Sequence, residues 1–140
     1  MKRILVIDGQ GGRLGALLIE ELKKKNVTAE IVAVGTNATA TAAMLKSGCD
    51  AGATGEYPVV YHAPRSAVII GPIGILSAGS LCGEITPDMA TAVGLSDSTK
   101  ILIPSERCTL HVVGTVKKTL VDYAAEAAAQ AVGALEAPEG

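Results

Sequence analysis

The stretch RILVIDGQGGRLG, residues 3–15, decides how this chain folds. Its first part, residues 3–8, is an apolar run of the length expected for a buried strand. Its second part is rich in glycine, and leucines at helical spacing begin at Leu14. A strand that ends in glycines and opens a helix is a phosphate-binding arrangement, because the helix N-terminus carries unpaired N–H donors and a partial positive charge. We therefore expect an α/β fold with an anion-binding turn.

The glycines at 9, 11 and 15 follow the spacing G-x-G-x-x-x-G, one residue longer than the common dinucleotide fingerprint. Gly9 would permit the tight turn, Gly11 and Gly12 would let backbone N–H groups approach an anion, and Gly15 would allow close packing of the helix. No Lys-Ser/Thr pair closes the turn, which excludes a P-loop. The alternative is a tight strand-to-helix turn that binds no ligand.

Strand and helix patterns alternate along the rest of the chain. Further strands are expected at 29–34, 50–54, 67–70 and 100–103, and helices at 14–26, 37–48, 56–63, 87–94 and 119–135. The alternation predicts a single-domain, three-layer, Rossmann-like fold over residues 1–136, with a mostly parallel sheet in the order 3-2-1-4-5. Residues 137–140 are expected to form a flexible tail.

A sixth strand is expected at 110–113, where Leu110 to Val113 form a short apolar run. The segment between it and the strand at 100–103 is far shorter than the dozen residues that a parallel crossover needs. The sixth strand is therefore predicted to lie antiparallel to the fifth, at the edge of the sheet.

A second glycine-rich segment, Gly71 to Gly74, follows the fourth strand. In the order 3-2-1-4-5, strands one and four are neighbours, and ligands bind in the crevice at their carboxyl ends. Two glycine loops would then face one cleft, with Asp8 orienting the first loop from below and Glu84 near the rim. The residues expected to contact the ligand are Asp8, Gly9, Gln10, Gly11, Gly12, Arg13, Leu14, Gly35, Thr36, Asn37, Gly71, Pro72, Ile73 and Gly74.

The end of the second strand bears on the choice of nucleotide. NAD sites usually place an Asp or Glu there for the ribose hydroxyls, whereas this chain has Gly35, Thr36 and Asn37, with neither an acid nor an arginine. Thr36 and Asn37 could donate to a ribose or a 2′-phosphate. Equally, they could only cap the following helix.

Composition excludes several classes of partner. The chain has 140 residues, a net charge of −2 and only three aromatic residues, which argues against a nucleic-acid partner because the basic patch and the stacking platforms are missing. Glycines interrupt the uncharged stretch between Arg65 and Glu84, which argues against a membrane span. The N-terminal apolar run stops at Asp8, too early for a signal peptide, so a cytoplasmic location is expected.

The candidates for catalysis are Cys82 and Glu84. A nucleophilic cysteine needs a neighbour that lowers its pKa, and sequence does not place His62 or His111 beside Cys82. A lone cysteine is commonly a small buried hydrophobe. No metal site is expected, because Cys108 and His111 would point to opposite faces if both lay on one strand.

The last helix is rich in alanine, which allows close approach of another helix. Its small residues could serve both the core and a second subunit, so a homo-oligomer is possible. A surface helix filled by propensity is the alternative.

The strings VIDGQGG at 6–12, GTN at 35–37, GATGE at 52–56, IGPIG at 70–74 and GEITP at 83–87 together resemble a family of short bacterial proteins known only as a domain of unknown function. The resemblance runs from Met1 to about Val116. It implies a small, cytoplasmic, Rossmann-like protein and supplies no activity and no catalytic residue.

These patterns favour a protein that binds a nucleotide or dinucleotide, NAD(P) by preference, as a sensor or a small oxidoreductase component. One alternative is a non-enzymatic interaction protein whose cleft is filled by Leu14, Ile73 or Ile75 and which oligomerises through its last helix. Another is a thiol enzyme that uses Cys82. Whether the chain is an enzyme is left open by the sequence.

Overall fold

The computed structural model describes residues 1–105 and 109–137. Over these residues, strands and helices alternate as the sequence predicts. In chain order they are β1 (Arg3–Asp8), α1 (Arg13–Lys24), β2 (Glu30–Gly35), α2 (Ala38–Lys46), β3 (Ala51–Thr54), α3 (Glu56–His62), the 3-10 turn η1 (Ala63–Arg65), β4 (Val68–Pro72), the 3-10 turn η2 (Ile73–Leu76), α4 (Pro87–Leu95), β5 (Thr99–Ile103) and α5 (Leu120–Glu136).

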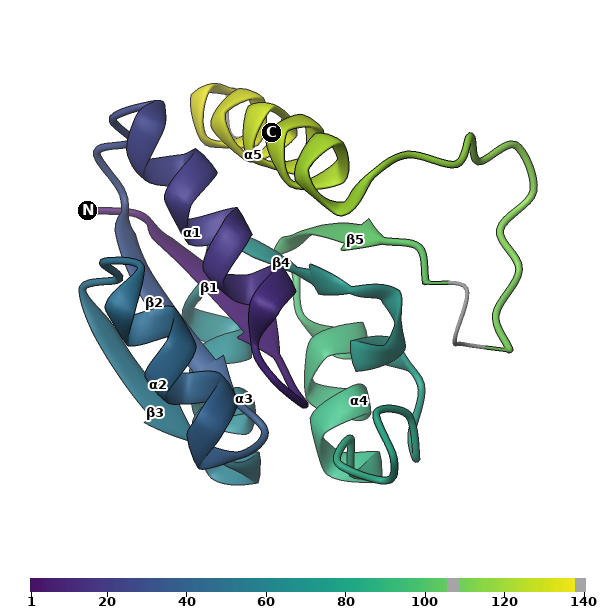
Figure 1. The fold of residues 1–140 in the computed structure, drawn as a ribbon. Coiled ribbons are helices and arrows are strands. Elements are labelled where there is room, and N and C mark those ends of the chain that lie inside the picture. Colours follow the sequence, from purple (N-terminus) through teal and green to yellow (C-terminus); the bar gives the residue numbers. More distant parts are fainter. Residues whose placement is uncertain (106–108, 138–140) are drawn as a thin grey trace.

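The five strands form one parallel sheet in the order β3-β2-β1-β4-β5, which confirms the predicted order (Figure 1). β1 lies at the centre and pairs with β2 from Arg3↔Glu30 to Asp8↔Gly35. Its other neighbour is β4, through pairs such as Val6↔Ile70. The order in which strands are added to the sheet therefore reverses between β1 and β4, and the carboxyl ends of these two parallel strands lie side by side.

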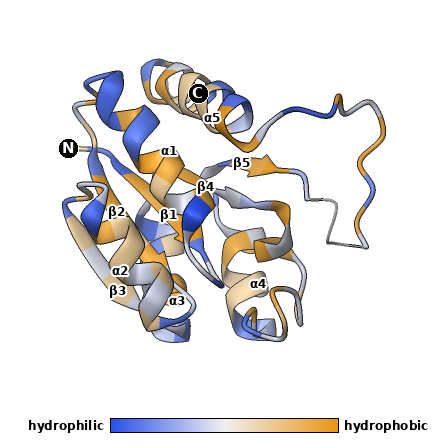
Figure 2. Cartoon of the chain, in the orientation of Figure 1, coloured by the Kyte–Doolittle hydropathy of each residue, from blue (hydrophilic) through white to orange (hydrophobic). Residues whose placement is uncertain are grey.

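Helices cover both faces of the sheet and give it three layers. Because side chains alternate along a strand, Ile4 and Val6 of β1 pack with α1 and α5, whereas Leu5 and Ile7 pack with α3 and α4. Both sets are fully buried, as expected for a parallel sheet. Figure 2 shows hydrophobic residues along the central strands and hydrophilic residues at the far end of α1.

Helix caps lie where the sequence predicts them. Asn37 Oδ1 accepts from the N–H of Ala40 (2.8 Å) and begins α2. Thr86 begins α4, and Thr119 Oγ1 accepts from the N–H of Asp122 (3.1 Å) to begin α5. These bonds satisfy donors that a helix N-terminus would otherwise leave unpaired.

The alanine-rich face of α5 packs inside its own chain. Ala124, Ala127, Ala128 and Ala131 are buried against α1 and the sheet. Their small side chains let the helix lie close to its neighbours, so this face serves the core.

None of the described helices combines the length and the apolar character that a membrane span requires.

The predicted antiparallel sixth strand is wrong. Residues 110–113 belong to an exposed arm, residues 109–119, that leads away from β5 before the chain returns to α5 (Figure 1). The arm turns at Gly114, which has a positive φ of 87°, and Thr115 Oγ1 donates to the carbonyl of Val112 (2.9 Å). The short connection excludes a parallel partner, but it does not require this segment to pair with β5. Among the described residues, no strand pairs with the outer edge of β5.

Candidate functional site

Asp8, the last residue of β1, organises the glycine turn. Its carboxylate accepts hydrogen bonds from the N–H groups of Gly9 (2.8 Å) and Gly15 (2.7 Å). A backbone bond from the N–H of Gly12 to the carbonyl of Gly9 (3.0 Å) closes the turn. Burial raises the pKa of Asp8, and the two N–H donors partly offset that rise. Asp8 therefore occupies the orienting position that the sequence suggests.

Two glycines in the turn are required by close packing. Gly12 has a positive φ of 74°, and a Cβ there would lie 2.7 Å from Ala40 Cα. A Cβ on Gly15 would lie 2.9 Å from the Cβ of Asp8, so Gly15 lets α1 start directly against the end of β1. By contrast, a Cβ on Gly11 would meet nothing within 4 Å. Gly11 leaves the backbone of the turn uncovered.

The unpaired donors lie in the glycine turn and at the first two residues of α1. Within the described residues, the N–H groups of Gly11, Arg13 and Leu14 have no hydrogen-bond acceptor, while those of Gly9, Gly12 and Gly15 are paired. α1 runs for 12 residues, so its N-terminus carries the partial positive charge of a full helix. An anion near these N–H groups would be stabilised by both effects.

These donors border a pocket of about 460 Å³ at the carboxyl ends of β1, β4 and β5. This is the crevice where the sheet order reverses. Its lining residues are Asp8, Gly9, Gln10, Gly11, Gly12, Arg13, Leu14, Pro72, Leu81, Ile103, Pro104, Ser105, Lys118, Leu120 and Tyr123.

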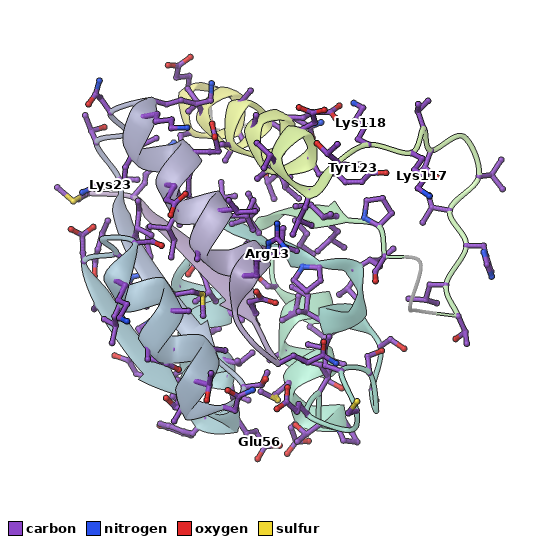
Figure 3. The ribbon with its side chains drawn as sticks, viewed as in Figure 1. Arg13, Lys23, Glu56, Lys117, Lys118 and Tyr123 are labelled. Atoms are coloured by element: carbon purple, nitrogen blue, oxygen red, sulfur yellow. The ribbon has the colours of Figure 1, made fainter. Side chains whose placement is uncertain are left out.

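Two cationic side chains, Arg13 and Lys118, border the same pocket. Figure 3 shows Arg13 near the start of α1 and Lys118 with Tyr123 near the start of α5, whereas Lys23 lies at the far end of α1. The ammonium of Lys118 bonds to the carboxylate of Glu126, which raises the pKa of Lys118. The hydroxyl of Tyr123 donates to the carbonyl of Val116 (2.9 Å) and ties the end of the arm to α5.

The segment Gly71–Gly74 is not a loop. Gly71 and Pro72 end β4, and Ile73 and Gly74 begin η2. A Cβ on Gly71 would lie 2.3 Å from the carbonyl oxygen of Ile7, so this glycine allows β4 to approach β1. Of the four residues, Pro72 alone lines the pocket beside the glycine turn. Further walls come from the end of β5, the end of the arm and the start of α5.

Glu84 brings a carboxylate to the end of β2, where the sequence has no acid. Its Oε1 accepts from the N–H of Gln10 (2.9 Å) and from Thr36 Oγ1 (2.8 Å), and its Oε2 accepts from Asn37 Nδ2 (2.8 Å). These bonds, led by that of Gln10, lower the pKa of Glu84. Gln10, Thr36 and Asn37 are thus joined through one carboxylate, while the backbone of Gly35 ends β2 beside them.

The side chains suggested for thiol chemistry are separated. Cys82 is exposed, and its sulfur accepts a weak bond from Gln10 Nε2 (3.7 Å). His62 contacts Arg3 (3.3 Å), the first residue of β1, and so lies at the opposite edge of the sheet. His111 is in the exposed arm, and Cys108 lies outside the described residues. Among the described residues, no group of three potential metal ligands occurs.

Sequence reasoning missed five residues of the pocket: Pro104 and Ser105 after β5, Lys118 of the arm, and Leu120 and Tyr123 of α5. Their position depends on the path of the chain from β5 to α5, and the predicted sixth strand gave this path wrongly. The one available signal was the rule that ligands bind beyond the carboxyl ends of parallel strands, which points to the residues after Ile103.

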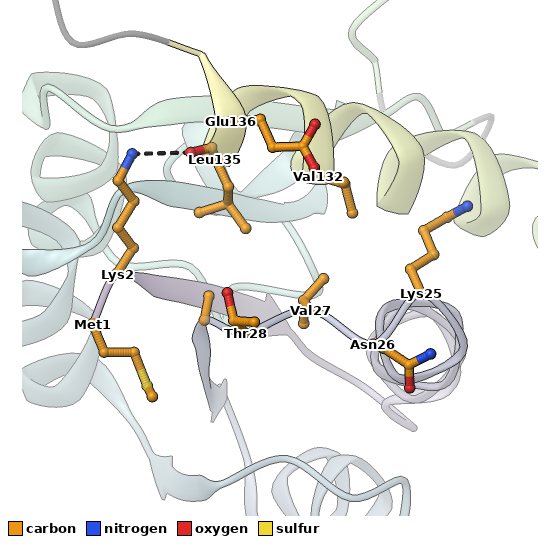
Figure 4. Close-up of a pocket in the computed structure, with 10 residues that line it drawn as sticks. Met1, Lys2, Lys25, Asn26, Val27, Thr28, Val132, Leu135 and Glu136 are labelled. Carbon is orange, nitrogen blue, oxygen red and sulfur yellow. Dashed lines mark hydrogen bonds between the residues drawn. The ribbon is translucent and has the colours of Figure 1, made fainter.

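A second pocket of about 460 Å³ lies at the opposite end of the strands, beside the residues that precede β1 and β2 (Figure 4). Met1, Lys2, Lys25 and Asn26 are among its lining residues, and Lys2 Nζ donates to the carbonyl of Leu135 (3.0 Å). It is bordered by the C-terminal ends of α1 and α5, whose partial negative charge disfavours an anion. The pocket beside the glycine turn is therefore the better candidate for a phosphate.

Comparisons with known proteins identify the family alone. Neither the curated proteins nor the solved structures include a match to this chain. The family described as "Domain of unknown function (DUF3842)" matches residues 3–136. The match covers nearly the whole chain, so the protein belongs to this family.

Proposed function

We propose that this protein binds a phosphate-bearing small molecule, a nucleotide or dinucleotide, in the pocket between the glycine turn and the ends of β4 and β5. The observation that carries the proposal is the set of unpaired N–H groups at Gly11, Arg13 and Leu14, which border a pocket at the point where the sheet order reverses. Arg13 adds positive charge to the same pocket, and Lys118 borders it while paired with Glu126.

The remaining walls suit the organic part of such a ligand. Leu14, Leu81, Ile103 and Leu120 supply apolar surface beside the phosphate-binding end. Binding sites for small molecules commonly combine apolar walls with a few placed polar groups. A pocket of about 460 Å³ is within the size range of such sites.

NAD(P) is the first ligand to test. Dinucleotides bind across this reversal point in sheets of this order, and an acid at the end of β2 commonly accepts hydrogen bonds from the ribose. Glu84 places a carboxylate at that position, held there by Thr36 and Asn37. The proposal is a binding function and assigns no reaction.

Calorimetric titration with NAD, NADP, ATP and FAD tests the proposal. The informative variant is Arg13→Gln, which removes a charge at the pocket, and its matched control is Lys23→Gln, which removes an exposed charge at the other end of the same helix. We expect at least one ligand to bind, with an affinity that Arg13→Gln lowers about tenfold, the scale of one charge-assisted hydrogen bond. Lys23→Gln should leave the affinity unchanged.

Two results would contradict the proposal. The first is the absence of binding for all four ligands, with the folded state verified by circular dichroism. The second is binding that Arg13→Gln and Lys23→Gln weaken equally, because that result would place the ligand away from the glycine turn.

A further inference from the structure

The arm, residues 109–119, exposes an apolar surface that the described part of its own chain leaves uncovered. Leu110 is 40% exposed, Val112 46%, Val113 100% and Val116 70%. None of these side chains belongs to either of the two hydrophobic clusters that form the core. Exposed apolar residues scattered singly are ordinary, but four within one projecting segment mark a contact surface.

The same segment has the composition of a strand. Thr109, Val112, Val113, Thr115 and Val116 are β-branched, a type enriched in strands. In an extended conformation, Leu110 and Val112 would share one face. Its far end is already fixed, because Tyr123 bonds to the carbonyl of Val116 and Thr119 caps α5.

β5 offers the matching surface, an open sheet edge. The N–H of Thr99 donates to the carbonyl of Ala67, just before β4, at 3.0 Å. Because amide directions alternate along a strand, the N–H and C=O groups of Lys100 and Leu102 point away from β4. In the described part of the chain, no segment bonds to that edge. Such an edge is a template for a strand from another chain.

We propose that residues 110–113 of one copy pair as a strand with the open edge of β5 in a second copy, so that the protein is a dimer built by reciprocal exchange of arms. Both complementary surfaces are present on one chain and lie together, since Leu102 and residues Gly114, Thr115 and Val116 line one groove of about 290 Å³. With a two-fold axis between the copies, the arm of each copy would pair with the β5 edge of the other. Two-fold symmetry is the commonest symmetry of homo-oligomers.

The second copy is a better occupant than an unrelated partner. Each copy supplies both an unpaired edge and an uncovered strand-forming segment, so pairing two copies satisfies both needs at once. The pairing would also fix the arm close to the pocket beside the glycine turn, because Lys118 borders that pocket. The proposal does not depend on any ligand.

Size-exclusion chromatography with light scattering tests the exchange on three proteins. They are the wild type, the double variant Val112→Asp/Val113→Asp, and the control Leu95→Asp. Leu95 is 81% exposed at the end of α4, so the control places a charge on an apolar residue outside the arm. Both variants change exposed positions, and circular dichroism and thermal melting check that they remain folded.

We expect the mass of two chains for the wild type and for Leu95→Asp, and the mass of one chain for the arm variant. Hydrogen exchange should show protected amides at Val112, Lys100 and Leu102 in the wild type, with protection lost in the arm variant. A monomeric wild type would overturn the proposal, including a monomer whose arm amides are protected, because its arm would then pair with its own β5. An arm variant that stays dimeric would overturn it as well.

Discussion

Asp8 sets the geometry of the glycine turn through one carboxylate. It is buried, with 6% of its surface exposed, and it holds Gly9 and Gly15 from opposite ends of the turn. This places the start of α1 directly at the end of β1. Between the two anchors, the N–H groups of Gly11, Arg13 and Leu14 have no hydrogen-bond acceptor among the described residues. A buried carboxylate is costly in its charged form, and the two N–H bonds repay part of that cost.

The raised pKa of Asp8 predicts how stability depends on pH. A carboxyl whose pKa is higher in the folded protein than in the unfolded chain, where it is near 3.8, contributes stability below 3.8. That contribution is lost as the pH rises through the folded pKa. The free energy of unfolding of the wild type minus that of Asp8→Asn should therefore fall as the pH rises. Urea unfolding of both proteins between pH 3 and 7 measures this difference. A difference that rises with pH would contradict the raised pKa of Asp8.

Glu84 is predicted to have the opposite dependence. Its pKa is lowered below the ordinary value of 4.5, so its stabilising contribution is present above that pH and is lost as the pH falls through the folded pKa. Glu84→Gln should cost about 1 kcal/mol of unfolding free energy at neutral pH, the scale of a partly solvated hydrogen bond to a charged group. The cost should shrink in acid. Equal costs at pH 7 and pH 3 would show that the charge does not link Gln10, Thr36 and Asn37.

At the scale of elements, the junction of β1 and α1 depends on how closely α2 approaches it. Gly12 is the contact point, since its backbone lies against Ala40 of α2, and it also has a left-handed conformation. Gly11, one residue earlier, faces open space. Neighbouring glycines thus have different roles, one structural and one that keeps the donors accessible.

Two alanine substitutions separate these roles. Gly12→Ala should lower the free energy of unfolding by about 2–4 kcal/mol, because the added methyl meets the backbone of α2 and the positive φ is unfavourable. Gly11→Ala should change it by less than about 0.5 kcal/mol, as surface changes usually do. Chemical denaturation measures both. Similar losses for the two variants would mean that the turn does not have the described conformation.

The difference between β5 and the arm shows what pattern can predict at this scale. Uniformly apolar runs such as Ile69–Ile70 predicted their strands, because a strand buried on both faces admits no polar side chain. Residues 110–113 have similar β propensity, yet they are exposed and pair with no strand among the described residues. A strand exists only when a neighbour accepts its hydrogen bonds, and propensity alone does not supply that neighbour.

For the whole molecule, the alternation of strands and helices was enough to predict the layers and the sheet order, since parallel strands require crossover helices. The first half of the candidate site followed from it, because Asp8 to Leu14 lie directly at the end of the central strand. The second half did not. Lys118 and Tyr123 reach the pocket only through the path of the arm, and Glu84 reaches the end of β2 from a turn 48 residues later in the chain than Thr36.

Two pockets of equal size on this molecule differ in chemistry because opposite ends of helices border them. The one beside the glycine turn is bordered by a helix N-terminus, whereas the one beside Lys2 and Lys25 is bordered by helix C-terminal ends. The orientation of the helices, which the parallel sheet imposes, therefore favours an anion in the pocket beside the glycine turn over one in the other pocket.

Backbone amide NMR during titration with NAD, or with pyrophosphate as the bare anion, is the sharpest test of a ligand site at the glycine turn. We expect the largest shift changes at the N–H groups of Gly11, Arg13 and Leu14, and no change at Lys25, Asn26 and Val27 beside the other pocket. Shift changes confined to residues 25–27, or none at the glycine turn with either ligand at saturating concentration, would rule out this site.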